Sequence, residues 1–327
     1  MVDVLEKKYQ KILWIFNYPN PNDIPSYVVG GIMPANILGI KKIIYLENHD
    51  PVKFLSNAKP KAIILSKAFN KNIHNLVNFA YEKKIKIISV FDDWNFDSFS
   101  RTDKSKINLP IAEKSDFIIV KTETASKVLY ENTKLSSFVI PDMLRFRSYE
   151  PISRIRYPFE VTWFGMPTNH DTLVSELKNI DASNIKINLR VITSHTNIIN
   201  NKITNLNLKN IDSQFIDWTP ESNKEIIKSD IVILPYAEDQ ERLVKSSNRI
   251  IDSLNLGRFV ILSNVEQFKE FKHYTYFGNI NNGLEWLKLN KAVALDKILK
   301  GQKYVNEFYS PESVSQLWRK IINKVLI

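Results

Sequence analysis

The residues with the clearest potential for ligand chemistry lie in one stretch, residues 230–262. Its opening apolar run predicts a buried strand that ends at Pro235, and Lys245–Asn248 (KSSN) opens a helix that Gly257 closes before the next strand. This order places a helix N-terminus at the carboxyl edge of a sheet. Because the first turn of a helix has free backbone N–H groups and the positive end of the dipole, an anionic diphosphate would bind well there.

Three charged side chains of this stretch extend the prediction. Lys245 and Arg249 would add positive charge beside a diphosphate, and Asp252 could accept hydrogen bonds from ribose hydroxyls. The alternative is an ordinary amphipathic helix with a solvated first turn. The residues by themselves are compatible with both interpretations.

Further candidates follow other predicted strands. Asp92 and Asp93 come just after the apolar run IKIISVF, where a carboxylate could act as a base for an acceptor hydroxyl or bind a cation. The alternative is a strand-end pair that caps the next segment or binds a basic side chain. His170 and His195 follow the first two strands of the second half, and either could donate to a phosphate or sugar oxygen or have a purely structural role.

Short apolar runs and amphipathic stretches alternate through the first half, which is typical of βαβ units with a parallel sheet covered on both faces. Helices are expected at Asn72–Lys83 and Thr124–Glu131. The expected strands are Lys11–Phe16, Lys42–Leu46, Ala62–Leu65, Ile85–Phe91, Phe117–Val120 and Phe138–Ile140.

The same alternation begins again after a charged stretch at Leu144–Pro158. The expected strands are Glu160–Phe164, Asn188–Ile192, Gln214–Trp218, Ile231–Leu234 and Phe259–Leu262, and the expected helices are Asp171–Leu177, Glu221–Ile227, Ser247–Leu256, Ala292–Tyr309 and Pro311–Val325. Ser310 and Pro311 signal the start of a separate last helix. We therefore expect an α/β protein of two Rossmann-like domains that face a cleft, with domains at 1–147 and 148–309 and a C-terminal helix at 310–327 that packs back on the N-terminal domain.

Composition narrows the function classes. The absence of cysteine excludes disulfides and thiolate metal sites, and no His/Asp/Glu group has metal-site spacing. The N-terminus has no signal-peptide core and no apolar run approaches the roughly 18 residues of a membrane span, so we expect a cytoplasmic protein. A net charge of +10 favours anionic partners. The lysines are scattered along the chain and form no nucleic-acid-binding module, so we expect no nucleic acid as a partner. Peripheral contact with the inner face of the membrane is compatible with this charge.

The stretch Lys245–Val260 resembles the nucleotide-sugar-binding segment of GT-B glycosyltransferases, whose form is K-S-x-N-R/K-x-x-E-A-L-x-x-G-x-P-V. Four N-terminal segments, at 62–67, 87–93, 115–123 and 139–142, look like successive strand ends of the family's acceptor domain, so the likeness covers most of the chain loosely. It implies sugar transfer from a nucleotide-sugar donor without an obligatory metal or cofactor. The residues assigned to the donor are Gly165, His195, Lys245, Ser246, Asn248, Arg249 and Asp252, those assigned to catalysis are Asp92 and Asp93, and those on the acceptor side are Gly30 and Gly31.

The sequence departs from the family's pattern at two places, and the resemblance is weakest at a third. Many retaining members carry a glutamate eight positions before the ribose-binding acid, where this chain has Val244; Glu238 and Glu241 are out of register. The basic residues that often follow the first strand of the C-terminal domain are missing after Gly165, although that glycine would let a ligand approach the backbone. Gly30 and Gly31 are the nearest candidates for the acceptor-domain glycine loop, and an ordinary turn is the simpler interpretation there.

We therefore expect a glycosyltransferase that moves a sugar from a nucleotide-diphosphate donor to an unknown acceptor hydroxyl, lipid-linked or on a polysaccharide, in surface polysaccharide or glycoconjugate synthesis. The alternative is a non-catalytic two-lobed protein that binds a nucleotide or nucleotide sugar, which the valine at position 244 motivates.

Overall fold

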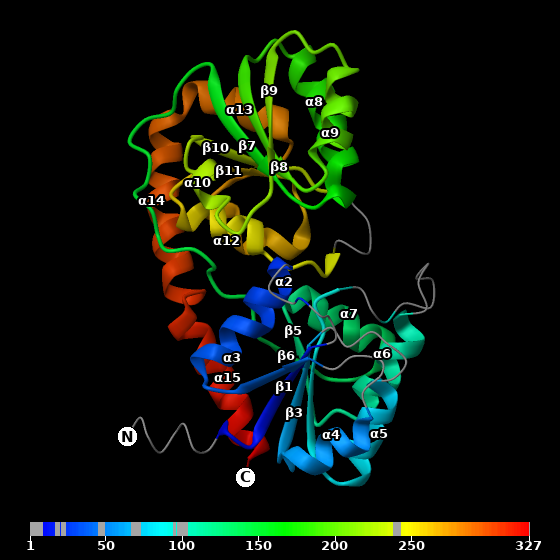
Figure 1. Cartoon of the computed structure of the whole chain (residues 1–327). Coiled ribbons are helices and arrows are strands. Elements are labelled where there is room, and N and C mark those ends of the chain that lie inside the picture. Colours follow the sequence, from blue (N-terminus) through cyan, green and yellow to red (C-terminus); the bar gives the residue numbers. More distant parts are fainter. Residues whose placement is uncertain are drawn as a thin grey trace. The chain divides into compact units, whose positions relative to one another are not determined.

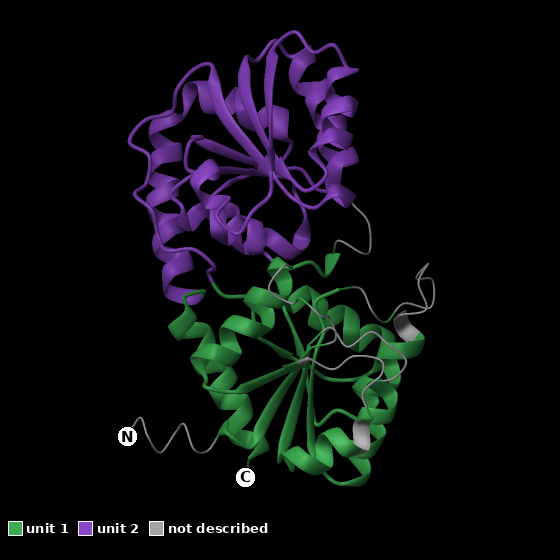
Figure 2. Cartoon of the chain, in the orientation of Figure 1, with its two compact units in different colours: residues 1–143, 240–246, 309–327 green, residues 144–239, 247–308 purple. Residues whose placement is uncertain are grey.

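The computed structural model describes residues 9–16, 20, 24–44, 50–66, 73–93, 96, 104–237 and 243–326. The chain divides into two compact units, coloured separately in Figure 2. Unit 1 comprises Met1–Met143, Gln240–Ser246 and Tyr309–Ile327, and unit 2 comprises Leu144–Asp239 and Ser247–Phe308. Each unit has its own parallel sheet with helices on both faces (Figure 1).

Unit 1 contains a six-stranded sheet with the order β2-β1-β3-β4-β5-β6, and every neighbouring pair is parallel. Its strands are almost wholly apolar because both faces of the sheet are covered; all side chains of β1 and β3 are buried. The strands are β1 (Ile12–Phe16), β2 (Lys41–Ile44), β3 (Ala62–Ser66), β4 (Lys86–Val90), β5 (Phe117–Val120) and β6 (Phe138–Val139).

The helices of unit 1 form two apolar layers with the sheet, one containing Trp14 and the other Leu13. The last helix, α15, belongs to the first layer, where the Trp318 and Trp14 rings lie 4.8 Å apart. It begins as the sequence predicts, with the Ser310 hydroxyl accepting from the Ser313 N–H at 3.2 Å. The helices are α2 (Pro25–Tyr27), the π-helix η2 (Val28–Ile32), α3 (Met33–Ile37), α4 (Pro51–Ala58), α5 (Ile73–Glu82), α6 (Lys104–Glu113), α7 (Glu123–Thr133) and α15 (Pro311–Val325).

Unit 2 contains a second six-stranded parallel sheet with the order β12-β11-β10-β7-β8-β9. The chain builds β7, β8 and β9 in one direction and then returns to the other side of β7 for β10, so the strand order reverses between β7 and β10. The strands are β7 (Phe159–Phe164), β8 (Ile187–Thr193), β9 (Ile211–Asp217), β10 (Ile231–Leu234), β11 (Phe259–Leu262) and β12 (Tyr276–Phe277).

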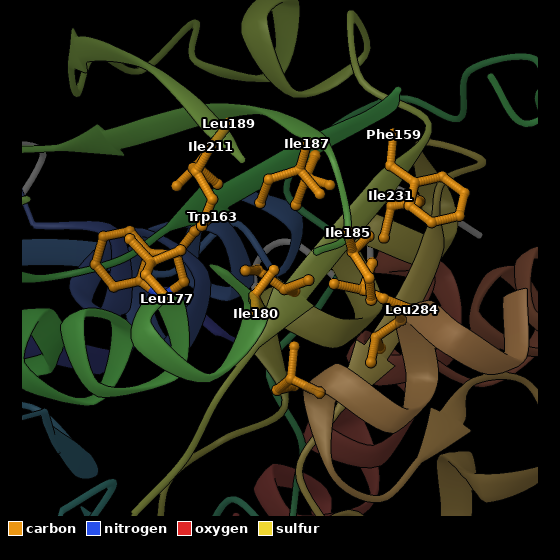
Figure 3. Packing of buried hydrophobic residues seen from close by; sticks show 14 of the residues in the cluster. Phe159, Trp163, Leu177, Ile180, Ile185, Ile187, Leu189, Ile211, Ile231 and Leu284 are labelled. Atoms are coloured by element: carbon orange, nitrogen blue, oxygen red, sulfur yellow. The ribbon is translucent and has the colours of Figure 1, made fainter. Parts of the chain in front are cut away.

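The core of unit 2 lies between this sheet and its helices (Figure 3). Trp163 of β7 is fully buried beside Leu177 and Ile180 of α8, and Leu284 of α13 packs in the same cluster. The helices are α8 (His170–Ala182), α9 (Thr196–Thr204), α10 (Asn223–Ile226), α12 (Asn248–Asn255), α13 (Ile280–Leu289) and α14 (Lys291–Phe308), with the 3-10 segments η3 (Pro167–Asn169) and η4 (Glu266–His273).

The predicted α/β class with two Rossmann-like sheets is confirmed, and all eleven predicted strands are present with small shifts at their ends. The largest shift is in β9, which begins at Ile211 instead of Gln214. Two-residue β12 and several helices, including α4, α6 and α13, were not predicted. No helix in the described ranges is long and apolar enough to cross a membrane.

Candidate functional site

The reversal of strand order between β7 and β10 marks the place where ligands bind in open parallel sheets, outside the carboxyl ends of the strands. Gly165 follows the last residue of β7, and Tyr236 lies two residues after the end of β10. The helix α12 comes next in the chain among the elements of unit 2. Gly165 and Arg249, two of the sequence-predicted donor residues, therefore lie at the position that topology favours.

Arg249 of α12 is held at this position by three groups of unit 2. Its Nη1 donates to the carbonyl oxygen of Phe164 at 3.2 Å, and its guanidinium carbon lies 4.7 Å from the centre of the Tyr236 ring. A Cβ built on Gly165 would lie only 3.1 Å from Nη1. The absence of a side chain at Gly165 therefore makes room for the guanidinium, and the predicted pair Gly165 and Arg249 lies together.

The positive charge of Arg249 has no carboxylate partner among the residues that the structure describes. Two other arginines of unit 2 do have carboxylate partners. Arg156 pairs with Asp230 at 2.6 Å, and Arg190 pairs with Glu160 at 2.9 Å. Arg249 is thus held at the edge where open parallel sheets bind ligands, and the described residues provide no carboxylate for its guanidinium N–H groups.

The first turn of α12 also has unused hydrogen-bonding capacity. Ser247 is the N-cap residue, but its side chain accepts no hydrogen bond from the helix. The side-chain oxygen Oδ1 of Asn248 is buried without a partner in the described part of the chain. A buried polar atom of this kind is uncommon and is satisfied when a ligand or water donates to it.

Asp252, predicted to bind ribose, lies one turn further along α12 and is 3% exposed. Its Oδ2 accepts a hydrogen bond from Nη2 of Arg145 at 2.9 Å. Sequence reasoning missed Arg145, because it lies in a charged stretch without any pattern that ties it to α12. The ribose role of Asp252 stays a prediction, and a ribose would meet a carboxylate that is already ion-paired.

The two predicted histidines of unit 2 lie in different surroundings. His170 is 2% exposed, and its Nε2 lies 3.0 Å from Oγ1 of Thr193, which itself donates to the Gly165 carbonyl at 2.7 Å. Burial, together with the nearby Lys202, lowers the pKa of His170 below its ordinary value. His195 is exposed at the carboxyl end of β8, where it precedes α9 in the left-handed conformation with φ of 59°. Of these two histidines, His195 is the one accessible to a ligand.

Lys245 and Ser246, predicted with the donor residues, belong to unit 1 although the residues on both sides of 240–246 belong to unit 2. Lys245 forms an ion pair with Asp93, which comes shortly after β4. Asp93 therefore binds a basic side chain, one of the alternatives that the sequence left open. A small pocket in unit 1 is lined by Asp92, Asp93, Val244 and neighbouring apolar side chains.

The environment of Val244 gives a physical reason for the missing acid at that position. Val244 is 4% exposed and packs in the apolar cluster of unit 1 with Phe91, Val120 and Leu129. A carboxylate there would lose its hydration without gaining a partner, so an apolar residue fits the site. Glu238 and Glu241, the nearest glutamates in the sequence, lie outside the described residues.

The turn expected at Gly30 and Gly31 is wrong, because both residues lie in the π-helix η2. Gly30 packs against a buried ion pair, in which Nζ of Lys121 lies 2.9 Å from Oδ1 of Asp142 and both side chains are 2% exposed. Gly31 packs against the Phe16 ring, which a Cβ would approach to 2.5 Å. Both glycines are therefore required for close helix packing. The sequence gives no signal of this role, because it does not show which buried side chains pack against a glycine in a helix.

No three His, Asp or Glu side chains lie together among the described residues in a way that could hold a metal ion.

Comparisons with known proteins rest on structure. No protein-family model and no curated protein matches the sequence. TarM is 18% identical to this chain, with a TM-score of 0.65. The match covers 84% of this chain, and the chain spans 57% of TarM's length. A second TarM structure gives S. aureus as its source. A UDP-forming trehalose-phosphate synthase from Burkholderia xenovorans is 10% identical with a TM-score of 0.59, with 84% of this chain and 77% of that one covered.

A third structure widens the range of activities. UDP-GlcNAc 2-epimerase from Neisseria meningitidis, bound to UDP-GlcNAc, is 10% identical with a TM-score of 0.53 and covers 96% of this chain and 99% of its own. These similarities show that the chain has a GT-B glycosyltransferase-like fold. The fold expected from the resemblance is therefore confirmed.

Proposed function

We propose that the protein is a glycosyltransferase that moves a sugar from a nucleotide-diphosphate donor to an acceptor hydroxyl in the synthesis of a surface polysaccharide or glycoconjugate. The observation that carries the proposal is the fixed guanidinium of Arg249 at the reversal of strand order in unit 2, without a carboxylate partner in the described residues. An anion completes this arrangement, and the diphosphate of a nucleotide sugar is the anion that the fold family uses.

In this proposal, unit 2 binds the donor. Arg249 and the first turn of α12 stabilise the negative charge that develops on the leaving diphosphate, so no metal or cofactor is obligatory. Gly165 makes room for the guanidinium of Arg249 beside the end of β7, and His195 and Asn248 offer further hydrogen bonds. Asp252 binds the ribose while Arg145 keeps its carboxylate oriented.

Unit 1 binds the acceptor in this proposal. Asp92 or Asp93 takes the proton of the acceptor hydroxyl, and Lys245 forms an ion pair with Asp93. Gly30 and Gly31 act here indirectly, by allowing η2 to pack closely. The net charge of +10 suits a lipid-linked acceptor at the inner face of a membrane, where anionic headgroups attract basic proteins.

Two of the structural relatives favour a uridine nucleotide as the donor. A TarM structure contains UDP, and the epimerase structure contains UDP-GlcNAc. We therefore propose a UDP-sugar as the first donor to test.

A second candidate function is a non-catalytic protein that binds a nucleotide or a nucleotide sugar. The burial of Val244 in apolar surroundings favours it, because no acid can act from that position. In this second candidate function, the same donor site binds the nucleotide or nucleotide sugar, but no sugar is transferred.

Binding and turnover of nucleotide sugars separate these candidates. UDP and a panel of UDP-sugars are titrated calorimetrically, and donor hydrolysis and transfer are followed by release of the nucleoside diphosphate. If the protein is a glycosyltransferase, one donor should bind saturably and be hydrolysed slowly. Arg249→Ala should weaken the binding and slow the hydrolysis, each at least tenfold. Arg319→Ala on α15 is the matched control. Binding without turnover for every donor and acceptor would favour the binding protein, and absence of any binding would reject both.

A further inference from the structure

We infer that Tyr236 is a positioning residue that sets the affinity of the donor site by holding the guanidinium of Arg249 in place for the diphosphate. The inference rests on the proposed function and adds a residue that the sequence did not single out. Its observation is the stacking of the Arg249 guanidinium on the Tyr236 ring, 4.7 Å from the ring centre.

An arginine at a solvent-facing edge needs such support. Its long side chain has many rotamers, and an anion that captures a mobile guanidinium must first order it. Preorganisation removes that loss from the binding step, and arginine stacks on aromatic faces because its guanidinium is planar and weakly hydrated. Tyr236 therefore strengthens anion binding without touching the anion.

Tyr236 is itself fixed within unit 2. Its backbone N–H donates to Oγ of Ser263 at 3.0 Å, which ties the segment after β10 to the end of β11. Its ring lies 5.0 Å from the ring of Phe268, which is fully buried. The ring is thus a rigid platform connected to the core.

Three sides of the Arg249 guanidinium are defined by these contacts. Tyr236 covers one face, the Phe164 carbonyl accepts from Nη1, and Gly165 leaves only enough space for the group. The contacts hold the guanidinium without neutralising its charge. This combination differs from that of Arg258, which is 4% exposed and donates to three backbone carbonyls as part of the core.

The chain offers a matched control for the stacking contact. Arg258 also lies over a tyrosine ring, that of Tyr149 at 5.7 Å, but it precedes β11 at the amino end of the strand, away from the carboxyl edge. Tyr149→Leu therefore removes an arginine–tyrosine contact from the same unit without touching the proposed donor site.

The test compares Tyr236→Phe, Tyr236→Leu and Tyr149→Leu in the full-length protein. Affinities for UDP and inorganic pyrophosphate are measured by calorimetry, and donor hydrolysis gives KM and kcat. We expect Tyr236→Phe to bind within about twofold of the unchanged protein and Tyr236→Leu to bind roughly threefold to thirtyfold more weakly, the range of a cation–π contact. KM for the donor should rise by a similar factor, and Tyr149→Leu should leave both affinities unchanged.

A second comparison covers the case in which Tyr236→Leu does not fold. Arg249→Ala removes the cation that stacks, so adding Tyr236→Met to it should not change the affinity for UDP further, whereas Tyr236→Met alone should weaken it at least threefold. Equal binding of UDP by Tyr236→Leu or Tyr236→Met and the unchanged protein would overturn the inference. Failure of the unchanged protein to bind any nucleoside diphosphate would instead reject the proposed function, and the two failures are therefore distinguishable.

Discussion

Arg145 and Asp252 form an ion pair of 2.9 Å within unit 2, with side chains that are 15% and 5% exposed. The pair connects α12 to the first residues of unit 2. The same helix face carries Asn255, whose side chain donates to the Phe146 carbonyl at 2.7 Å. The helix that bears Arg249 is therefore fixed on this face by residues 145–146.

The first prediction concerns this ion pair. Arg145→Ala leaves the buried Asp252 carboxylate without its cation, so we expect unit 2 to lose roughly 2–4 kcal/mol, somewhat below the range of a fully buried pair. Unfolding in urea, followed by circular dichroism, measures the change. Lys300→Ala, which breaks an exposed pair with Asp296, should change stability by less than about 1 kcal/mol. A similar small change in Arg145→Ala would show that the Asp252 carboxylate does not need its partner.

The second prediction concerns Lys121 and Asp142, whose side chains are each 2% exposed. Lys121→Met leaves a buried carboxylate unpaired and should destabilise unit 1 by about 3–5 kcal/mol, whereas the double variant Lys121→Met/Asp142→Leu should recover most of that loss. Gly30→Ala should also destabilise, because its methyl would lie 3.2 Å from Asp142 Oδ1 and 3.3 Å from Lys121 Nζ. Thermal unfolding of the four proteins tests the set, and a double variant less stable than Lys121→Met would contradict it.

The strands and the last helix could be predicted from the sequence because their signals are local. Continuous apolar runs such as ILWIF, and the pair Ser310 and Pro311, depend on residues next to each other in the chain. Residues 230–262 likewise carry a strand, a helix start and a closing glycine within one stretch. These features need no knowledge of distant contacts.

The contacts of the candidate site could not be predicted, because they join residues far apart in the sequence. Arg145 and Asp252 are separated by 107 residues, and Lys245 and Asp93 by 152. No periodicity ties these charges together before the sheets form. The prediction of a turn at Gly30 failed for a different reason, because a glycine required for close packing in a helix has the same local signal as a glycine in a turn.

The third prediction concerns the acid that the resemblance led us to expect at position 244. Val244→Glu should not create a catalytic group, because it would place a carboxylate among Phe91, Val120 and Leu129. We expect a loss of roughly 2–4 kcal/mol in the stability of unit 1, with the introduced acid kept neutral by burial. Val244→Leu controls for the change in size. Faster donor hydrolysis by Val244→Glu at unchanged stability would contradict this account.

The fourth prediction follows from the lowered pKa of His170, which has burial as its largest cause. The unfolded chain binds a proton at this residue near its ordinary pKa of 6.5, and the folded protein binds it only at lower pH. Stability is therefore unaffected well above pH 6.5 and falls as the pH drops below it, by at most about 1.4 kcal/mol per pH unit.

Urea unfolding between pH 7.5 and 5 measures this dependence, and His170→Gln should make it shallower. His273→Gln is the matched control for the loss of an imidazole, because His273 is exposed and is not among the groups that shift the pKa of His170. An identical slope in His170→Gln and the unchanged protein would show that other groups account for the loss of stability in acid.

The fifth prediction concerns Gly165. A substitution there tests the space that Arg249 requires without a change in the conformation of the backbone. Gly165 does not have a positive φ, so alanine introduces no backbone strain, but its methyl would lie 3.1 Å both from Arg249 Nη1 and from Cζ2 of the buried Trp163. Because the Trp163 ring is fixed in the core, the guanidinium must move. We expect Gly165→Ala to raise the KM for the donor about tenfold and to cost roughly 1–3 kcal/mol of stability, because the methyl also crowds the Trp163 ring. Steady-state kinetics with thermal unfolding tests this, and an unchanged KM would mean that the position of Arg249 does not determine donor binding.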